Sequence, residues 1–200
     1  GSEVNVQLPA HCLCHSVSDI ILRVYGNADN IVADHDGKMI LSLTVSDARI
    51  INELVINMIP GPMDIAVAND AIPVQDSVPP EYVSSMIISG VPEFRLAMKL
   101  GARYMILKNY SPGICNGVLC VLKSFSRYTV QAQLLTGPRK RSIVILPRVT
   151  FNVSASTSGL PFDFVRTQFP ITLAYCVTVH KAQGQTLQRV GLYFSGETFA

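Results

Sequence analysis

The amino-acid sequence predicts an α/β fold in which a parallel sheet with helices carries a small antiparallel β module. Two patterns support this prediction. Strand-like and helix-like apolar patterns alternate in the first half of the chain, as in parallel sheets with helical connections. Three strand-like segments with short turns then follow one another between residues 118 and 151. The chain is also 48% hydrophobic with a mean hydropathy of +0.33, so it can bury a sizeable core.

The first predicted elements are a helix over residues 16–26 and a buried strand over residues 38–45. Ser16 or Ser18 can cap the helix, its apolar residues share one face, and Gly26 ends it. The strand is rich in β-branched residues and leucine, which is typical of a buried strand. Residues 27–37 between them are polar and predict a loop.

A second amphipathic helix is expected over residues 46–59, with Ser46 as its cap and Pro60-Gly61-Pro62 as its stop. Residues 63–78 are acidic and irregular, which predicts a loop. A short helix is expected to begin at Pro79-Pro80 and to end before Gly90.

The second half begins with a predicted strand over residues 103–107. The antiparallel module follows with strands over 118–125, 128–135 and 142–151, and Pro147 indicates an edge or a bulge in the last of these. A helix over residues 169–177 and a strand over 190–194 complete the chain. We therefore expect residues 1–112 and 152–200 to form the main domain and residues 113–151 to form the insert.

The charge is divided between the two halves of the chain, although the net charge is only +2. Residues 1–94 carry three basic and twelve acidic residues, whereas residues 95–200 carry thirteen basic and two acidic residues. A basic half of this kind predicts a polyanionic partner, because lysine and arginine neutralise the phosphates of nucleic acids. The alternative is that the acidic half simply packs on the basic half.

The five cysteines are odd in number and unevenly spaced, which favours free thiols over disulfides. The segment from His11 to His15 reads HCLCH and suggests zinc at first sight. However, a Cys-x-Cys spacing is tight and no second ligand pair follows, so we predict no metal site. No apolar run reaches the roughly 20 residues of a membrane span, and no membrane partner is expected.

The most informative segment runs from Thr178 to Leu187 and reads TVHKAQGQTL. It places polar side chains between two apolar stretches, which is typical of a site displayed by a rigid scaffold. Lys181 suits a phosphate, while Thr178 and His180 can donate hydrogen bonds to backbone oxygens of a nucleic acid. Gln183 and Gln185 offer amides, and Gly184 permits close approach of a ligand. No carboxylate stands nearby to orient His180, which argues against acid–base catalysis, and a solvated polar loop is the alternative.

The segment His180–Leu187 resembles motif V of the PIF-type (petite integration frequency) DNA helicases, a group in superfamily one that includes RecD relatives and the helicase part of Helitron transposons. Further segments agree with the same family. Residues 96–109 resemble its L-x-L-K-x-G-x-x-V-M-L-L-R-N, residues 113–117 its G-L-C-N-G, residues 160–162 its L-P-F and residues 166–170 its R-R-Q-F-P. The resemblance is strong over about residues 90–194 and weaker over 38–62.

This resemblance implies a second RecA-like motor domain with an inserted small, Src-homology-like β-barrel. It implies that Thr178, His180, Lys181 and Gln183 face single-stranded DNA or RNA, and that Gly184 and Gln185 lie toward an ATP cleft.

Two further groups of residues lie around the expected insert. Asn109 and Asn116 are expected either to fix turns or to touch the strand, since Asn-Gly is a turn signal on its own. Arg139, Lys140 and Arg141 are expected at a turn of the insert, as a solvated loop or as phosphate contacts.

The sequence also departs from the family in ways that bear on activity. It contains no G-x-x-x-x-G-K-[ST] loop for ATP phosphates and does not reach the arginine of the family's V-A-L-S-R segment. Val45 and Thr167 replace an asparagine and an arginine of the family pattern. Since hydrolysis needs the phosphate loop, the metal and the arginine together, we expect no ATPase activity from this chain alone.

The expected function is that of a helicase-derived module that binds single-stranded nucleic acid or a protein partner. The alternative is a portion of an active ATP-dependent DNA helicase, in which case ATP and Mg²⁺ serve the complete protein. A protein partner or self-association is expected through a motor-domain interface left exposed. The family further implies an intracellular, nuclear or mitochondrial location.

Overall fold

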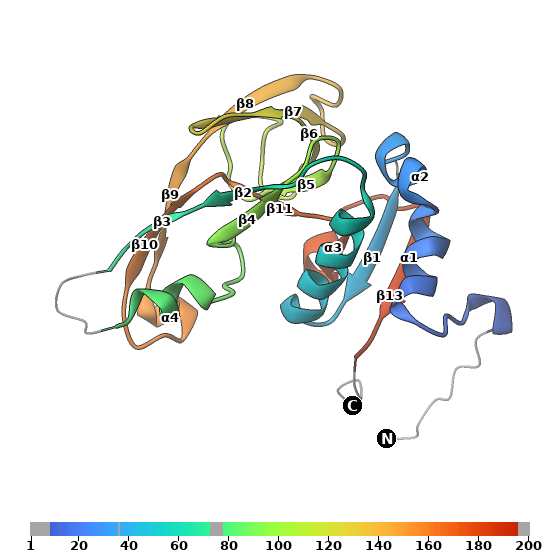
Figure 1. The fold of residues 1–200 in the computed structure, drawn as a ribbon, viewed down its shortest axis with the longest axis horizontal. Helices are drawn as coiled ribbons and strands as arrows, with labels where there is room; N and C mark the ends of the chain where they lie inside the picture. Colours follow the sequence, from blue (N-terminus) through green and yellow to red (C-terminus); the bar gives the residue numbers. More distant parts are fainter. Residues whose placement is uncertain (1–8, 36, 73–77, 196–200) are drawn as a thin grey trace.

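The computed structural model describes residues 9–35, 37–72 and 78–195, and it shows a mixed α/β fold (Figure 1). Its parallel part is a three-stranded sheet in the order β12-β1-β13. These strands are β1 (Lys38–Ser42), β12 (Cys176–Thr178) and β13 (Arg189–Tyr193). Helix α1 (Val17–Tyr25) packs on β1 and β13, whereas α3 (Val45–Met58) packs on β1 and β12. The mixed α/β character that the sequence predicts is thus confirmed.

The helix ends follow local hydrogen bonding. The Ser16 hydroxyl accepts a hydrogen bond from the Asp19 amide at 3.1 Å, and Gly26 ends α1 with φ +81°, a conformation that favours glycine. Helix α3 is capped by Thr44, whose hydroxyl accepts from the Asp47 amide at 3.1 Å. The expected cap at Ser46 was wrong, because the helix begins one residue earlier, at Val45.

The short helices differ in how well they were predicted. Helix α4 (Pro80–Ser85) begins with a proline, as predicted. Helix α2 (Ala28–Ala33) occupies the predicted loop 27–37, where the Asn27 side chain caps it. The remaining helices are a 3-10 turn η1 (Ala10–Cys12), α5 (Ala155–Ser158) and α6 (Val179–Ala182).

The rest of the described strands pair in antiparallel fashion in three sheets. The largest has the order β11-β5-β6-β7-β8, and the others have the orders β3-β10-β9 and β2-β4. Their bounds are β2 (Asp64–Val67), β3 (Asn69–Ala71), β4 (Arg95–Met98), β5 (Arg103–Ile106), β6 (Leu119–Phe125), β7 (Thr129–Leu134), β8 (Ile143–Pro147), β9 (Val149–Val153), β10 (Phe164–Gln168) and β11 (Ile171–Leu173). Strands β2 and β3 lie in the predicted loop 63–78, of which residues 73–77 lie outside the described part.

Two breaks turn the chain from one antiparallel sheet to the next. The predicted strand 142–151 is divided at Arg148 into β8 and β9, directly after Pro147. Similarly, Phe169 and Pro170 separate β10 from β11. A proline thus lies at each of the two breaks, in keeping with its lack of the amide hydrogen that a sheet ladder uses. The predicted helix over 169–177 was wrong, because this segment forms β11 and β12 with Ala174 and Tyr175 as the corner between them.

The sheets are not arranged as the sequence predicted in every respect. Parallel pairing is limited to three described strands, and the strand orders describe open sheets rather than a closed barrel. The five-stranded sheet combines strands from residues 119–147 with β5 and β11, which lie outside the expected insert. The domain boundaries at 112 and 152 therefore stay a prediction.

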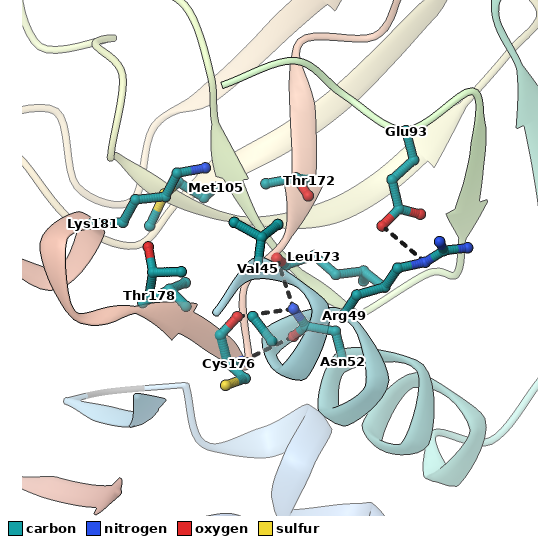
Figure 2. Close-up of a pocket in the computed structure, with 12 residues that line it drawn as sticks. Val45, Arg49, Asn52, Glu93, Met105, Thr172, Leu173, Cys176, Thr178 and Lys181 are labelled. Carbon is teal, nitrogen blue, oxygen red and sulfur yellow. Dashed lines mark hydrogen bonds and ion pairs between the residues drawn. The ribbon is translucent and has the colours of Figure 1, made fainter. Parts of the chain in front are cut away.

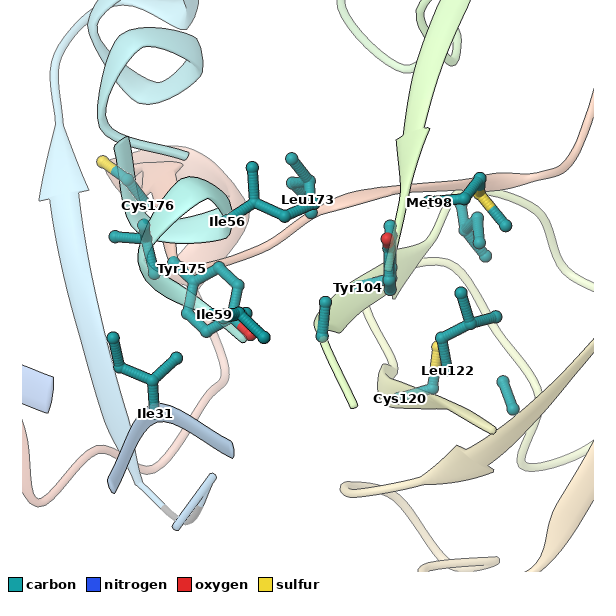
Figure 3. Packing of buried hydrophobic residues seen from close by; sticks show 14 of the residues in the cluster. Ile31, Ile56, Ile59, Met98, Tyr104, Cys120, Leu122, Leu173, Tyr175 and Cys176 are labelled. Atoms are coloured by element: carbon teal, nitrogen blue, oxygen red, sulfur yellow. The ribbon is translucent and has the colours of Figure 1, made fainter. Parts of the chain in front are cut away.

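The main core joins the parallel part to the antiparallel part. Figure 3 shows Ile56, Ile59 and Tyr175 on one side and Tyr104 and Leu122 on the other. At their junction Arg103 in β5 is 1% exposed, and described residues give it no carboxylate. Its guanidinium instead donates to the carbonyls of Ala174 (3.0 Å) and Lys38 (2.8 Å) and to the Tyr25 hydroxyl (2.7 Å).

Asn52 fixes helix α3 to the corner between β11 and β12. Its amide nitrogen donates to the carbonyls of Cys176 (2.8 Å) and Leu173 (3.3 Å). Its oxygen accepts from the amides of Tyr175 and Cys176, both at 2.9 Å. Asn52 is buried, so these backbone groups have little access to water as substitute partners.

We predict that Asn52→Ala lowers the free energy of unfolding by about 3 kcal/mol, because it leaves several buried backbone groups unpaired. Asn57→Ala, at an exposed position of the same helix, is the matched control and should change it by less than about 0.5 kcal/mol. Urea unfolding followed by circular dichroism measures both variants. Equal effects of the two substitutions would contradict the assigned role of Asn52.

Candidate nucleic-acid interface

The TVHKAQGQTL segment crosses from the parallel sheet to a surface turn. Thr178 is the last residue of β12 and precedes the single helical turn α6. The amide of Gln185 donates to the carbonyl of Ala182 at 3.0 Å, and Gly184 has φ +83°, so the chain reverses here before β13. Ala182 is buried, which holds the segment to the core while His180 and Gln183 are exposed.

A groove of about 490 Å³ lies beside this segment, and we call it the Lys181 groove. Its walls come from the Lys181–Leu187 stretch, the turn at residues 116–119, the loop after β7 and the start of β1. Three lysines line it: Lys38, Lys140 and Lys181. Lys38 also forms an ion pair with Asp34. Such a groove suits an anionic ligand.

Lys181 also lines a second, smaller hollow of about 60 Å³, between α3 and the β11–β12 corner (Figure 2). In that figure its side chain lies beside Met105 and Thr178, while Arg49 and Glu93 face each other on the other side. Burial lowers the pKa of Lys181 and raises the pKa of Glu93. Within residues 9–35, 37–72 and 78–195, no hydrogen bond or ion pair satisfies the Lys181 ammonium. A half-buried cation without a partner is costly, and an anion would stabilise it.

Asn109 and Asn116 shape the turn that forms one wall of the groove. The Asn109 side-chain oxygen accepts a hydrogen bond from the Asn116 amide at 2.8 Å. The Val118 amide donates to the Cys115 carbonyl at 3.1 Å, and Gly117 between them has φ +90°. This geometry is that of a type II turn with glycine at its third position. The turn-forming alternative therefore applies to Asn109, whereas Asn116 also lines the groove.

The basic loop Arg139-Lys140-Arg141 joins β7 to β8, next to the same turn. A Cβ atom on Gly113 would meet the Arg139 side chain at 2.8 Å, so the two loops are in close contact. Arg141 has φ +75°, which is strained for a residue with a side chain, and its amide donates to the Leu134 carbonyl at 2.8 Å. Lys140 lines the groove, while the exposed Arg139 and Arg141 are not among its lining residues.

The structure brings together six of the eleven predicted residues around one groove. They are Asn116, Lys140, Lys181, Gln183, Gly184 and Gln185. Thr178 lines the smaller hollow instead, and His180 is exposed outside both. Sequence reasoning missed Lys38 and Thr136, because each lies far from the motif along the chain. No pattern in the sequence places them beside it.

Gln185 is the residue of the motif that contacts both walls. Its amide nitrogen donates to the Gly117 carbonyl at 3.5 Å, a long hydrogen bond. Its side-chain oxygen is buried and has no hydrogen-bond partner within the described part of the chain. Gln185 therefore keeps an unused acceptor at the groove, which a donor on a bound ligand or a water could satisfy.

Comparisons with known proteins agree on one class of protein. The family profile "DNA helicase Pif1, 2B domain" matches residues 81–125. The human "ATP-dependent DNA helicase PIF1" is 29% identical over 159 residues, which is 77% of this chain and 22% of that protein. The predicted resemblance to PIF-type helicases is thus confirmed.

Solved structures show the same fold. The Pif1 helicase of Candida albicans matches 88% of this chain and 46% of its own with a TM-score of 0.60 and 20% identity. The Bacteroides Pif1 helicase in complex with ADP-AlF3 and single-stranded DNA matches 92% of this chain and 42% of its own, with a TM-score of 0.58 and 20% identity. The chain is a Pif1 helicase-related region that spans less than half of these relatives.

Two negative observations concern the described residues. They contain no helix long and apolar enough to cross a bilayer. They also contain no cluster of three or more His, Cys, Asp or Glu side chains that could hold a metal ion.

We predict that Lys181→Met raises the free energy of unfolding at pH 7, because it removes a partly buried charge while keeping the length of the side chain. The lowered pKa of Lys181 means that the wild type gains stability as the pH rises toward the ordinary lysine pKa. The advantage of the variant should therefore shrink above about pH 10, near that ordinary value. Thermal unfolding at several pH values measures it, and a variant less stable than wild type at pH 7 would contradict the unpaired state of Lys181.

Proposed function

We propose that this chain is part of a Pif1-type helicase and binds single-stranded nucleic acid in the Lys181 groove. The observation that carries the proposal is the half-buried Lys181 ammonium, which no described residue pairs and which borders two hollows. An unpaired cation on a rigid turn is suited to a phosphate, since the ligand supplies the missing partner.

The surroundings of the groove suit a polyanion. Residues 95–151 contain ten basic residues and no acidic residue, and they contribute one whole wall. Asn116 and Gln183 add amide groups that can bond to phosphate or base edges. Gly184 has open space where a Cβ atom would stand, so a ligand can come close to the backbone.

The finer features of the family extend this proposal. The three-stranded parallel sheet corresponds to part of a second RecA-like motor domain, and the antiparallel sheet corresponds to its inserted Src-homology-like module. Gly184 and Gln185 face a nucleotide cleft completed by the first motor domain, where ATP and Mg²⁺ act. This chain alone contains no phosphate loop, so it binds nucleic acid without hydrolysing ATP.

We predict that the chain binds a labelled single-stranded oligonucleotide and that Lys181→Met weakens binding about tenfold, which corresponds to about 1.4 kcal/mol. The dependence of log affinity on log salt should become shallower by about one phosphate contact. Fluorescence anisotropy across a salt series measures both quantities, with DNA and RNA oligonucleotides of the same sequence compared.

Lys123→Met is the matched control, because Lys123 is exposed in β6 and does not line the groove. This substitution should change the affinity by at most twofold to threefold, because salt screens a surface charge that lies far from the groove. Binding that is absent at low salt would refute the proposal. Binding that Lys123→Met weakens as much as Lys181→Met would assign it to general charge instead of the groove.

A second candidate function, association through the surface of α3, rests on apolar exposure. Ile50 and Leu54, which lie one turn apart on α3, are 55% and 43% exposed. An apolar surface of this kind is suited to contact with another motor domain, a partner or a second copy.

We predict that the chain self-associates with increasing concentration and that the double substitution Ile50→Lys and Leu54→Lys abolishes this. Sedimentation velocity over a hundredfold concentration range is the measurement. A wild-type protein that remains monomeric throughout would rule out self-association by this surface.

A further inference from the structure

Strand β8 forms a free edge of the five-stranded sheet, whose order ends at β8. The Leu134 amide donates to the Ser142 carbonyl at 2.9 Å, and the Arg148 amide donates to the Tyr128 carbonyl at 3.2 Å. In an antiparallel ladder alternate residues turn their amide and carbonyl groups toward the neighbouring strand. The backbone groups of Ile143 and Ile145 therefore point away from β7, and no described strand pairs with them.

The side chains on this edge are apolar and exposed. Ile143 is 60% exposed and Ile145 is 63% exposed, whereas Val144 and Leu146 between them are buried. Figure 1 shows β8 at the outer margin of the antiparallel half. Exposed edge strands with apolar side chains are unusual, because they pair readily with other strands.

The charges around β8 are all of one sign along the chain. Arg139 and Arg141 precede it and Arg148 follows it, and the Arg148 guanidinium donates a hydrogen bond to the carbonyl of Arg127 in the neighbouring turn. No acidic residue occurs between residues 95 and 151. A second copy of β8 in antiparallel pairing would bring Arg141 opposite the Arg148 region of its partner, and like charges opposite one another are destabilising. Charge complementarity instead favours an acidic partner.

We propose that β8 accepts an extended peptide strand from an acidic protein segment, by addition of a strand to the sheet. The peptide pairs with the outward backbone groups of Ile143 and Ile145 and places apolar side chains beside theirs. Acidic residues of the peptide meet the exposed Arg139 and Arg141 at the start of β8. Pro147 has no amide hydrogen, so the pairing ends there and the matching segment is short. Aliphatic side chains offer nucleic-acid bases no aromatic stacking platform, which favours a peptide over a nucleic acid here.

The test uses a fluorescein-labelled peptide that has two aspartates at each end and alternating valine and threonine residues between them. Anisotropy should show binding that weakens at high salt, and a peptide with lysines in place of the aspartates should bind at least tenfold more weakly. Ile145→Pro should reduce binding of the acidic peptide at least tenfold. This proline removes an amide hydrogen that faces away from β7, so the hydrogen bonds between β7 and β8 stay intact. Edge strands tolerate proline at positions of this kind.

Ile145→Thr is the matched control, because threonine keeps the backbone amide and the β-branched shape. The affinity of this variant for the acidic peptide should stay within threefold of the wild-type affinity. Circular dichroism confirms that both variants fold. A peptide that binds Ile145→Pro as well as wild type would overturn the proposal. Displacement of the peptide by a single-stranded oligonucleotide, with an oligonucleotide affinity that falls in Ile145→Pro, would assign the edge to nucleic acid. A concentration-dependent dimer lost in Ile145→Pro would assign it to a second copy of the chain.

Discussion

The arrangement of the two parts of the molecule depends on the buried guanidinium of Arg103. It stands in β5 and donates to carbonyls of β1 and of the β11–β12 corner, and it lies 5.2 Å and 4.9 Å from the ring centres of Tyr25 and Tyr175. Burial of a guanidinium is costly unless its donors are satisfied, and here carbonyls, a hydroxyl and two aromatic faces serve that purpose. The contact fixes the corner from which β12 runs to Thr178. The position of the motif against the antiparallel sheet, and therefore the Lys181 groove, follows from it.

Local signals in the sequence predicted those elements that local forces decide. Helix α1 has its capping serine, its apolar face and its closing glycine within one short segment, so its bounds could be predicted. The prediction of a helix over residues 169–177 was wrong because the conformation of this segment is decided by partners far away in sequence. Strand β11 pairs with β5, and β12 pairs with β1. Strands β2 and β3 were missed for the same reason, since their partners are β4 and β10.

The candidate site was predictable where it lies in one stretch of sequence, and the resemblance found that stretch. The resemblance alone could not distinguish residues that contact a ligand from residues that stabilise the fold. Arg166 and Gln168 belong to a family pattern, yet Arg166 forms a buried ion pair with Asp70 at 2.7 Å and Gln168 donates to the Ala66 carbonyl at 2.8 Å. Asn109 holds a turn in the same way. Conversely, Lys38 lines the groove although it lies far from the motif in sequence. It is the first residue of β1, and parallel pairing places it opposite Arg189 of β13.

The two walls of the Lys181 groove belong to different sheets, and this has a mechanical consequence. The motif extends from the parallel sheet, whereas the Cys115–Val118 turn and the loop after β7 extend from the antiparallel one. The bond from Gln185 to Gly117, which spans the opening, is 3.5 Å long and therefore weak. The width of the groove therefore depends on the angle between the two sheets. A bound nucleic-acid strand that contacts both walls would hold the two sheets at a fixed angle. Motion between the two sheets would therefore be smaller when the groove is occupied than when it is empty.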